Sequence, residues 1–119
     1  MSNPLRIAVS EEKGAKPITV LHLTGDLDSK TYQDLETKAG EAIAKGADRI
    51  VLELGGVTFM GSAGLRAMHG VANKLKSAGA GGKLRLANPS DAVARIMKTL
   101  GFDQMFEISG SLDEAVAGF

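Results

Sequence analysis

The sequence contains no cysteine among its 119 residues, which excludes disulfides and thiolate metal sites. It also has no excess of charge of either sign, because 14 basic side chains balance 14 acidic ones. Domains that bind nucleic acid usually carry a basic face, so we expect no nucleic-acid partner. No apolar run approaches the roughly 18 residues that a membrane span needs, and we expect no direct membrane insertion. Residues 1–6 lack the basic-then-apolar pattern of a signal peptide, which predicts a cytoplasmic protein.

What the sequence does contain is the composition of one globular domain. Apolar residues make up 44% and charged residues 24%, which provides enough apolar surface for a core and argues against disorder. A chain of 119 residues is near the usual size of one domain, so we predict a single domain over residues 1–119. Glycine is over-represented, with 15 residues, and most of these stand singly where turns and helix ends use them.

Two apolar runs near the start of the chain predict a pair of strands. Residues 5–9 alternate apolar with other side chains and predict a half-buried strand. Residues 10–16 are polar and include Gly14, which predicts a loop. Residues 18–23 are nearly all apolar and rich in β-formers, which predicts a strand buried on both faces.

Three further strands are predicted later in the chain. Residues 50–54 predict a third strand, which Gly55 and Gly56 would break before a turn over residues 57–61. The other two strands are short segments marked by pairs of apolar residues, namely Leu84 with Leu86 and Phe106 with Ile108.

Apolar residues spaced by three and four predict four helices. The first helix would begin with Asp28 as its N-cap, with Leu27 and Tyr32 as a hydrophobic staple, and end at Gly46. The second would cover about residues 63–78, with Ser62 as its N-cap. Its predicted buried stripe consists of Leu65, Met68, Ala72 and Leu75.

The last two helices have clear signals at their ends. The third would begin with Pro89 in its first turn and end at Gly101. The fourth would begin with a capping box formed by Ser111 and Glu114. Strand–helix–strand units require parallel pairing and right-handed crossovers. We therefore predict an α/β fold, a mixed and mostly parallel sheet of about five strands with about four helices mainly on one face.

Catalytic motifs fail at specific positions. A nucleophilic serine elbow would need glycine at position 60, where this chain has Met60, and an acid and a histidine later in the chain than Ser62. His69 does not meet this requirement, because it lies only seven residues after Ser62, on the predicted helix that Ser62 begins. The segment Gly79-Ala80-Gly81-Gly82-Lys83 resembles a phosphate-binding loop, but Leu84 follows the lysine and the context is helix-to-strand. We interpret that segment as an ordinary loop.

Metal-ligating patterns are equally weak. The two histidines, His22 and His69, show no ligand spacing. The paired carboxylates Asp26 and Asp28 are better explained as a turn and an N-cap. The sequence therefore predicts no catalytic residue, no metal site and no cofactor.

The segment from Phe59 to Leu65 remains as the candidate site. Phe59 and Met60 are apolar residues that we expect to be exposed, and they precede Ser62 at the start of a helix. As an N-cap, Ser62 would have only a structural role. A phosphate there would add about −1.5 to −2 charges at pH 7, which the helix dipole tolerates but an apolar partner surface does not.

These segments together resemble the STAS domain family, specifically the stand-alone bacterial anti-sigma factor antagonists. The resemblance extends from Leu5 to about Ala117. Its matching pieces are Gly25-Asp26-Leu27-Asp28, the strand over 50–54, the junction over 57–65, and Asn88-Pro89 followed by residues 93–102. Each piece is a weak signal alone, whereas their order and spacing together are specific.

The resemblance implies a non-enzymatic partner switch. In that family the unmodified antagonist binds a serine kinase of the histidine-kinase-like ATPase type, which is also the anti-sigma factor. This capture releases a sigma factor. The kinase phosphorylates a serine at the start of the second helix, which ends the complex, and a PP2C-type phosphatase reverses it. The position that matches this serine is Ser62.

The resemblance also implies a partner-binding surface around that serine. Its predicted members are Asp26, Phe59, Met60, Gly61, Ala63, Gly64, Leu65 and Arg66. Family members commonly carry an acidic residue where this chain has Gly61, and a second serine where it has Ala63. Thr58 is then the other hydroxyl near Ser62.

Two alternatives stay open. A STAS module can act without phosphorylation, as a scaffold or an accessory subunit, for example of a lipid-transport complex at the inner membrane. Gly61 favours this alternative, because it removes the carboxylate that commonly precedes the phosphorylated serine. The other alternative is a small hydrolase that uses Ser62, for which the motif is incomplete.

Overall fold

The computed structural model describes residues 3–13, 16–78 and 83–119. Its five strands are β1 (Arg6–Lys13), β2 (Pro17–Leu27), β3 (Arg49–Met60), β4 (Lys83–Ala87) and β5 (Glu107–Ser109). They form one sheet in the order β1-β2-β3-β4-β5. β1 is antiparallel to β2, and the other neighbouring strands are parallel. The predicted mixed, mostly parallel sheet is confirmed.

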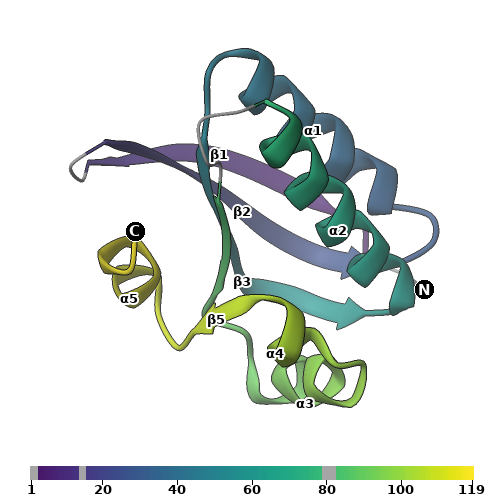
Figure 1. Cartoon of the computed structure of the whole chain (residues 1–119). Coiled ribbons are helices and arrows are strands. Elements are labelled where there is room, and N and C mark those ends of the chain that lie inside the picture. The colour runs from purple at the N-terminus through teal and green to yellow at the C-terminus, as the bar shows by residue number, and fades with distance from the viewer. Residues whose placement is uncertain (1–2, 14–15, 79–82) are drawn as a thin grey trace.

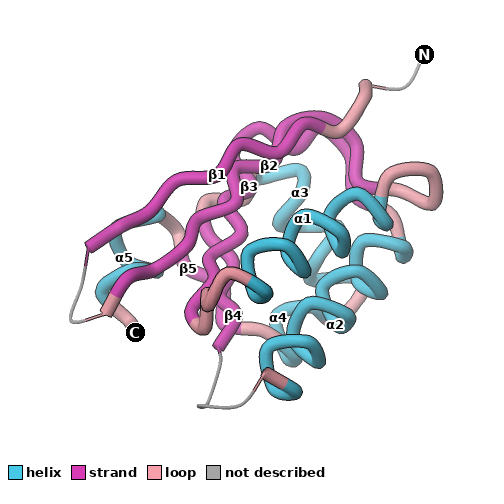
Figure 2. Tube along the Cα trace, turned by 90° about the horizontal axis from the view of Figure 1, so that it is seen from above, coloured by secondary structure: helices cyan, strands magenta, loops and turns pink. Residues whose placement is uncertain are grey.

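The helices divide unequally between the two faces of this sheet. They are α1 (Tyr32–Ala44), α2 (Ser62–Ser77), α3 (Asp91–Thr99), α4 (Phe102–Met105) and α5 (Leu112–Ala117). α1 and α2 lie side by side on one face, and α5 lies alone on the other (Figures 1 and 2). α4 was not predicted, because four residues are too few to show a helical period. No helix among the described residues is both long and apolar enough to cross a membrane.

Two apolar clusters match these two faces. The larger one joins the sheet to α1–α4 and includes Leu21 and Leu23 of β2. The smaller one joins Ile18 and Val20 of the same strand to Ala115 of α5. β2 is therefore buried on both faces, as its continuous apolar run predicted.

The β1–β2 hairpin is longer than predicted. The predicted loop over 10–16 was wrong over residues 10–13, because β1 continues to Lys13 and pairs with β2 as far as Pro17, whereas Lys16 lies outside both strands. Gly14 lies outside the described residues. Val9 is 51% exposed although it alternates with its neighbours as a half-buried residue would. The hairpin projects beyond α1 and α2 (Figure 1). Val9 lines a surface pocket with Ala42 and Ala47 at the end of α1.

β3 is the largest departure from the prediction. The expected break at Gly55 and Gly56 does not occur, because β3 continues to Met60. Its second half pairs with the end of β2, where Gly25 lies opposite Val57. Register shifts in this stretch show that the irregularity is absorbed as a bulge, a place where glycine is common. The site segment is therefore strand up to Met60 and not a free turn.

The predicted starts of α1 and α3 are shifted by two or three residues. Asp28 is not the N-cap of α1, because its carboxylate accepts the Lys30 N–H at 2.9 Å in a turn that precedes the actual N-cap, Thr31. The predicted staple, which required Asp28 as the cap, is therefore also wrong. Pro89 precedes α3, whose N-cap Ser90 accepts the Val93 N–H at 3.2 Å.

Other helix ends agree with the sequence. The stops at Gly46 and Gly101 have φ of 103° and 83°, in the region that favours glycine. At the start of α5, Ser111 accepts the Glu114 N–H at 3.2 Å as predicted. The Glu114 carboxylate reaches the N–H of Gly110 instead of the cap residue itself. The loop predicted at 79–82 lies outside the described residues.

The buried side of α2 is rotated relative to the prediction. Met68 and Leu75 are buried as expected, whereas Leu65 and Ala72 are only half-buried. The other inward positions are small or β-branched residues, namely Gly64, Ala67 and Val71. Small side chains face inward because α2 lies close to the strand ends, and Leu65 is thereby left at the rim of the candidate site.

Candidate functional site

The candidate site is the junction between β3 and α2. The Gly61 N–H donates to the Leu27 carbonyl at 3.0 Å, which extends the pairing of β2 and β3 to their ends. Gly61 is the N-cap and has an extended backbone, with φ of −104° and ψ of −177°. Ser62 is the first residue of the helix and is exposed. The prediction of Ser62 as N-cap was therefore wrong by one residue.

This shift changes what the Ser62 hydroxyl does. An N-cap hydroxyl accepts a backbone N–H of the first turn and is held by it. Gly61 has no side chain with which to cap α2. The Ser62 side chain instead starts from the first helical position, at the surface, where an external enzyme can reach it.

Strand alternation separates the two apolar residues before the serine. Phe59 is 47% exposed, whereas Met60 is only 1% exposed and belongs to the larger apolar cluster. Successive side chains of a strand point to opposite faces, and here Met60 points into the larger apolar cluster whereas Phe59 points away from it. The expectation that Met60 is exposed was wrong, and Phe59 alone forms the exposed apolar part of the junction.

Gly64 sets how closely α2 approaches the strands beneath it. A Cβ atom at this position would lie 3.0 Å from Cγ of Met60 and 3.2 Å from Cδ2 of Leu27. These separations are tighter than ordinary van der Waals contact. Gly64 was predicted to shape the contact surface; the structure buries it, and it fixes how closely the start of α2 approaches β2 and β3.

Asp26 is buried and clamps three segments together. Its carboxylate accepts the Thr58 hydroxyl at 2.8 Å and the Asn3 N–H at 3.0 Å. The Thr58 hydrogen bond, followed by the backbone bond from Asn3, lowers the pKa of the Asp26 carboxyl, although burial opposes this shift. Asp26 was predicted to contact a partner, but its carboxylate is committed within the protein. It therefore positions the β2 and β3 ends that carry the site.

The same clamp distinguishes the two hydroxyls of the segment. Thr58 donates its hydroxyl proton to Asp26 and accepts the Asn3 side-chain amide at 3.2 Å. Modification of Thr58 would break both contacts. Ser62 is the hydroxyl that can be modified without disturbing this clamp.

A groove extends from the junction toward α3. It has a volume of about 460 Å³ and is lined by Met60, Gly61, Ser62, Arg95, Ile96, Thr99 and Leu100. Ile96 and Leu100, which line the α3 side of this groove, are only half-buried. Sequence reasoning missed the contribution of α3 because residues 95–100 lie far from Ser62 in the chain and reach it only through the β4–α3 connection.

The remaining predicted contact residues form the rim of the junction. Ala63 and Leu65 are half-buried, and Arg66 is exposed. Gly61 is half-buried, and a Cβ added to it would lie 3.4 Å from the Phe59 ring, an ordinary contact. Its extended backbone is available to any residue, so the fold does not require glycine here.

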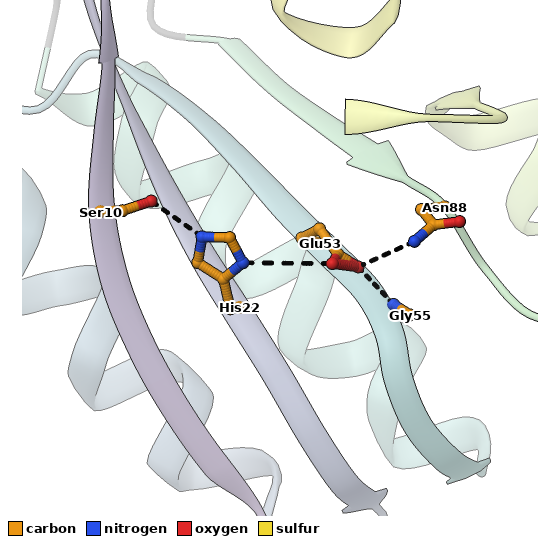
Figure 3. Close-up of polar contacts among 5 residues, drawn as sticks. All are labelled: Ser10, His22, Glu53, Gly55 and Asn88. Carbon is orange, nitrogen blue, oxygen red and sulfur yellow. Dashed lines mark hydrogen bonds and ion pairs between the residues drawn. The ribbon is translucent and has the colours of Figure 1, made fainter. Parts of the chain in front are cut away.

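A second polar cluster lies on the sheet face that carries α5 (Figure 3). The Ser10 hydroxyl is 2.8 Å from Nε2 of His22, and Nδ1 of His22 is 4.0 Å from Oε2 of Glu53. The Glu53 carboxylate also accepts the Gly55 N–H and lies 3.5 Å from the Asn88 side-chain nitrogen. A Cβ at Gly55 would approach Nδ2 of Asn88 to 2.7 Å, so this glycine leaves room for the cluster.

The order of groups in this cluster is serine, imidazole and carboxylate, as in a nucleophilic triad. The separation of 4.0 Å between His22 and Glu53 is an ion-pair distance and too long for the hydrogen bond that orients a catalytic histidine. Ser10 is also exposed on an edge strand. We therefore interpret the cluster as a surface network of the outer face.

The other histidine is engaged away from Ser62. Nε2 of His69 lies 3.2 Å from Sδ of Met105, and its ring centroid is 5.2 Å from that of Phe106. His69 therefore belongs to the contact between α2 and the segment around α4. Within the described ranges, no three His, Asp or Glu side chains are grouped as metal ligands.

Comparison with known proteins gives consistent matches over nearly the whole chain. The family model of the STAS domain matches residues 8–115. Over 120 residues the chain is 28% identical to the anti-sigma-F factor antagonist RsfB of Mycobacterium tuberculosis (strain ATCC 25618 / H37Rv), covering 99% of this chain and 93% of RsfB. Over 97 residues it is 32% identical to BtrV of Bordetella bronchiseptica, which also bears the name of an anti-sigma factor antagonist, covering 82% of each protein.

A solved structure extends this agreement to the fold. The crystal structure of an anti-sigma factor antagonist from Mycobacterium paratuberculosis matches with a TM-score of 0.79 and 26% identity. The match covers 99% of this chain and 97% of that one. The arrangement of strands and helices described above is therefore shared with an experimentally determined structure.

Proposed function

The chain belongs to the STAS domain family, and we propose that it is an anti-sigma factor antagonist that works by partner switching. The names of RsfB and BtrV support the antagonist role. In its unphosphorylated form the protein binds an anti-sigma factor, and this binding releases a sigma factor. Phosphorylation of Ser62 ends the complex.

The observation that carries this proposal is the position of Ser62. Its side chain is exposed at the first residue of α2, three residues after the exposed Phe59, and it lines the groove along α3. A partner that covers this surface also covers the serine. A single modification can therefore control binding without any change of fold.

The electrostatic argument gives the size of the effect. A phosphate on Ser62 adds about −1.5 to −2 charges in the middle of the contact surface. Burying an unpaired charge costs several kcal/mol, and each 1.4 kcal/mol changes affinity about tenfold. Within the free protein the phosphate stays in water at the positive end of the α2 dipole, so the fold keeps its stability.

We further propose the identities of the partners. The anti-sigma factor is itself the serine kinase, of the histidine-kinase-like ATPase type, and a PP2C-type phosphatase removes the phosphate. On this proposal the antagonist catalyses no reaction and acts in the cytoplasm with these enzymes. Phe59, Leu65 and Arg66 supply its exposed contacts, with Gly61 and Ala63 between them.

Phosphopeptide mapping of the protein isolated from its own cells tests the proposal. Trypsin releases residues 50–66 as one peptide, which contains both Thr58 and Ser62. We expect phosphate on Ser62. Phosphate on Thr58 alone would move the site, and a well-detected peptide without phosphate under every growth condition would contradict the switch.

One observation favours a second candidate function. Gly61 stands where an acidic residue is common in the family, and the backbone at this position does not demand glycine. The protein would then be a constitutive scaffold or accessory subunit that uses the same surface, for example in a lipid-transport complex. Affinity purification from the native cells distinguishes the two, because a scaffold should recover transporter subunits instead of a kinase.

A further inference from the structure

We propose that Arg95 of α3 is an internal partner for the phosphate on Ser62. When Ser62 is phosphorylated, the phosphoryl group turns across the groove and pairs with the Arg95 guanidinium. This inference rests on the proposed function, because it requires that Ser62 be the modified residue. It adds a means by which phosphorylation blocks the groove as well as changing its charge.

The geometry of the groove supports this pairing. Ser62 lines it from the α2 side, and Arg95 lines it from the α3 side, together with Ile96, Thr99 and Leu100. Arg95 is exposed, so its guanidinium is free to move. None of the ion pairs found among residues 3–13, 16–78 and 83–119 involves Arg95.

The chemistry favours arginine for this role. A guanidinium presents several N–H donors in a planar fork that matches the oxygens of a phosphate. The first turn of α2 contains no acidic side chain that would compete for Arg95 or repel the phosphate. The carboxylate of Asp26, at the end of β2, is already bound to Thr58 and Asn3.

Arg66 is the competing cation. It lies four residues after Ser62 on the same helix, a spacing at which side chains can meet. Arg66 does not line the groove, whereas Arg95 does. Pairing with Arg66 would leave the groove open, and pairing with Arg95 covers Ile96 and Leu100. The two possible pairings can therefore be distinguished by whether phosphorylation changes the surroundings of Ile96 and Leu100.

The test uses the full chain with phosphoserine introduced at position 62 during translation, which requires no cellular kinase. The second pKa of a phosphoserine is about 6, and ³¹P NMR follows its titration directly. We expect Arg95→Gln to raise this pKa by about half a unit, since a nearby cation favours the dianion. Arg95→Lys should restore most of the difference, because it keeps the charge.

Two matched controls locate the effect. Lys98→Gln removes the same charge from α3 at a residue that does not line the groove, and it should leave the phosphate pKa unchanged. Arg66→Gln should raise the pKa less than Arg95→Gln does. In the wild-type chain, phosphorylation should also shift the methyl resonances of Ile96 and Leu100, and Arg95→Gln should abolish these shifts.

Several outcomes would overturn the inference. They are an unchanged pKa in Arg95→Gln, an equal rise in Lys98→Gln, a larger rise in Arg66→Gln, or unshifted Ile96 and Leu100 methyl groups. Each would leave the proposed function standing. Conversely, an absence of phosphate in the cellular peptide would contradict the proposed function without affecting this titration, so the two failures are distinguishable.

Discussion

Two surface serines of this protein have opposite environments. Ser10, on the outer face of the sheet, is 2.8 Å from an imidazole that a glutamate faces (Figure 3). Ser62, at the β3–α2 junction, is exposed at the start of a helix that no side chain caps. Ser10 has the neighbours that a catalytic serine has, an imidazole and a carboxylate. We nevertheless propose Ser62 as the residue of the switch.

This difference shows which properties a serine needs if its phosphorylation is to control binding. A serine that an external kinase modifies requires exposure, a position on a binding surface, and a fold that does not depend on its hydroxyl. Ser62 is exposed and lines a groove, and our proposal places it on the binding surface. Ser10 is tied to a polar network on an edge strand, where charge and hydrogen bonding blunt unwanted strand pairing.

The largest expected effect is the contrast between Gly64 at the junction and Gly55 in the polar cluster of the outer face. Gly64→Val should lower the free energy of unfolding by about 2 kcal/mol, because the added side chain overpacks Met60 and Leu27. Gly55→Val meets only the movable ends of Glu53 and Asn88, so its effect should stay within about 0.5 kcal/mol. Urea unfolding of both variants measures the difference, and equal losses would contradict the assigned role of Gly64.

The next effect concerns binding and not stability. Ser62→Asp should weaken the complex with the anti-sigma factor at least tenfold, or about 1.4 kcal/mol, with nearly unchanged thermal stability. Ser10→Asp, which adds the same charge on the other face, should leave the affinity unchanged. Calorimetric titration of both variants tests this, and equal affinities of Ser62→Asp and the wild type would refute the switch.

The dependence of stability on low pH should distinguish the Asp26 carboxylate from ordinary surface carboxylates. The pKa of Asp26 is lowered from its ordinary value of 3.8, so the folded state holds the ionised carboxylate more strongly than the unfolded chain does. This contribution to stability is present above about pH 4 and is lost as the pH falls through the lowered folded-state pKa.

Asp26→Asn should therefore lose stability near neutral pH and show a weaker dependence on pH below 4 than the wild type. Unfolding curves measured between pH 2 and 7 provide the comparison. Asp103→Asn, which removes an exposed carboxylate from α4, is the control and should follow the wild-type curve. Parallel curves for Asp26→Asn and the wild type would show that the clamp does not act through ionisation.

The smallest effect is expected in the polar cluster of the outer face. His22→Asn removes an imidazole that is partly exposed and lies 4.0 Å from Glu53, a separation at which surface ion pairs contribute little. We expect the free energy of unfolding to change by less than about 0.5 kcal/mol. A loss of several kcal/mol in urea unfolding would mean that this network is a structural centre of the sheet.

Local signals in the sequence predicted most of the architecture. The apolar run of β2 predicted burial on both faces, and the strand–helix order predicted the mixed sheet. Gly46, Gly101 and Ser111 marked helix ends correctly. These features depend on neighbours within a few residues, which is the range that a sequence pattern reports.

The errors at the β3–α2 junction share one cause, which is pairing between distant segments. Gly55 and Gly56 would end an isolated strand, but hydrogen bonding to the end of β2 carries β3 through to Met60. That extension buries Met60, exposes Phe59 and moves the N-cap to Gly61. None of these consequences follows from the residues around position 60 alone.

The sequence by itself determined the type of the protein: an α/β domain with an exposed serine at the start of its second helix and no net charge. Only the tertiary structure decided what surrounds that serine. It placed Arg95, Ile96 and Leu100 beside Ser62, and it committed Asp26 and Thr58 to an internal clamp. The physical reason is that a parallel sheet brings the ends of separate strand–helix units together, whereas sequence periodicity reports each unit alone.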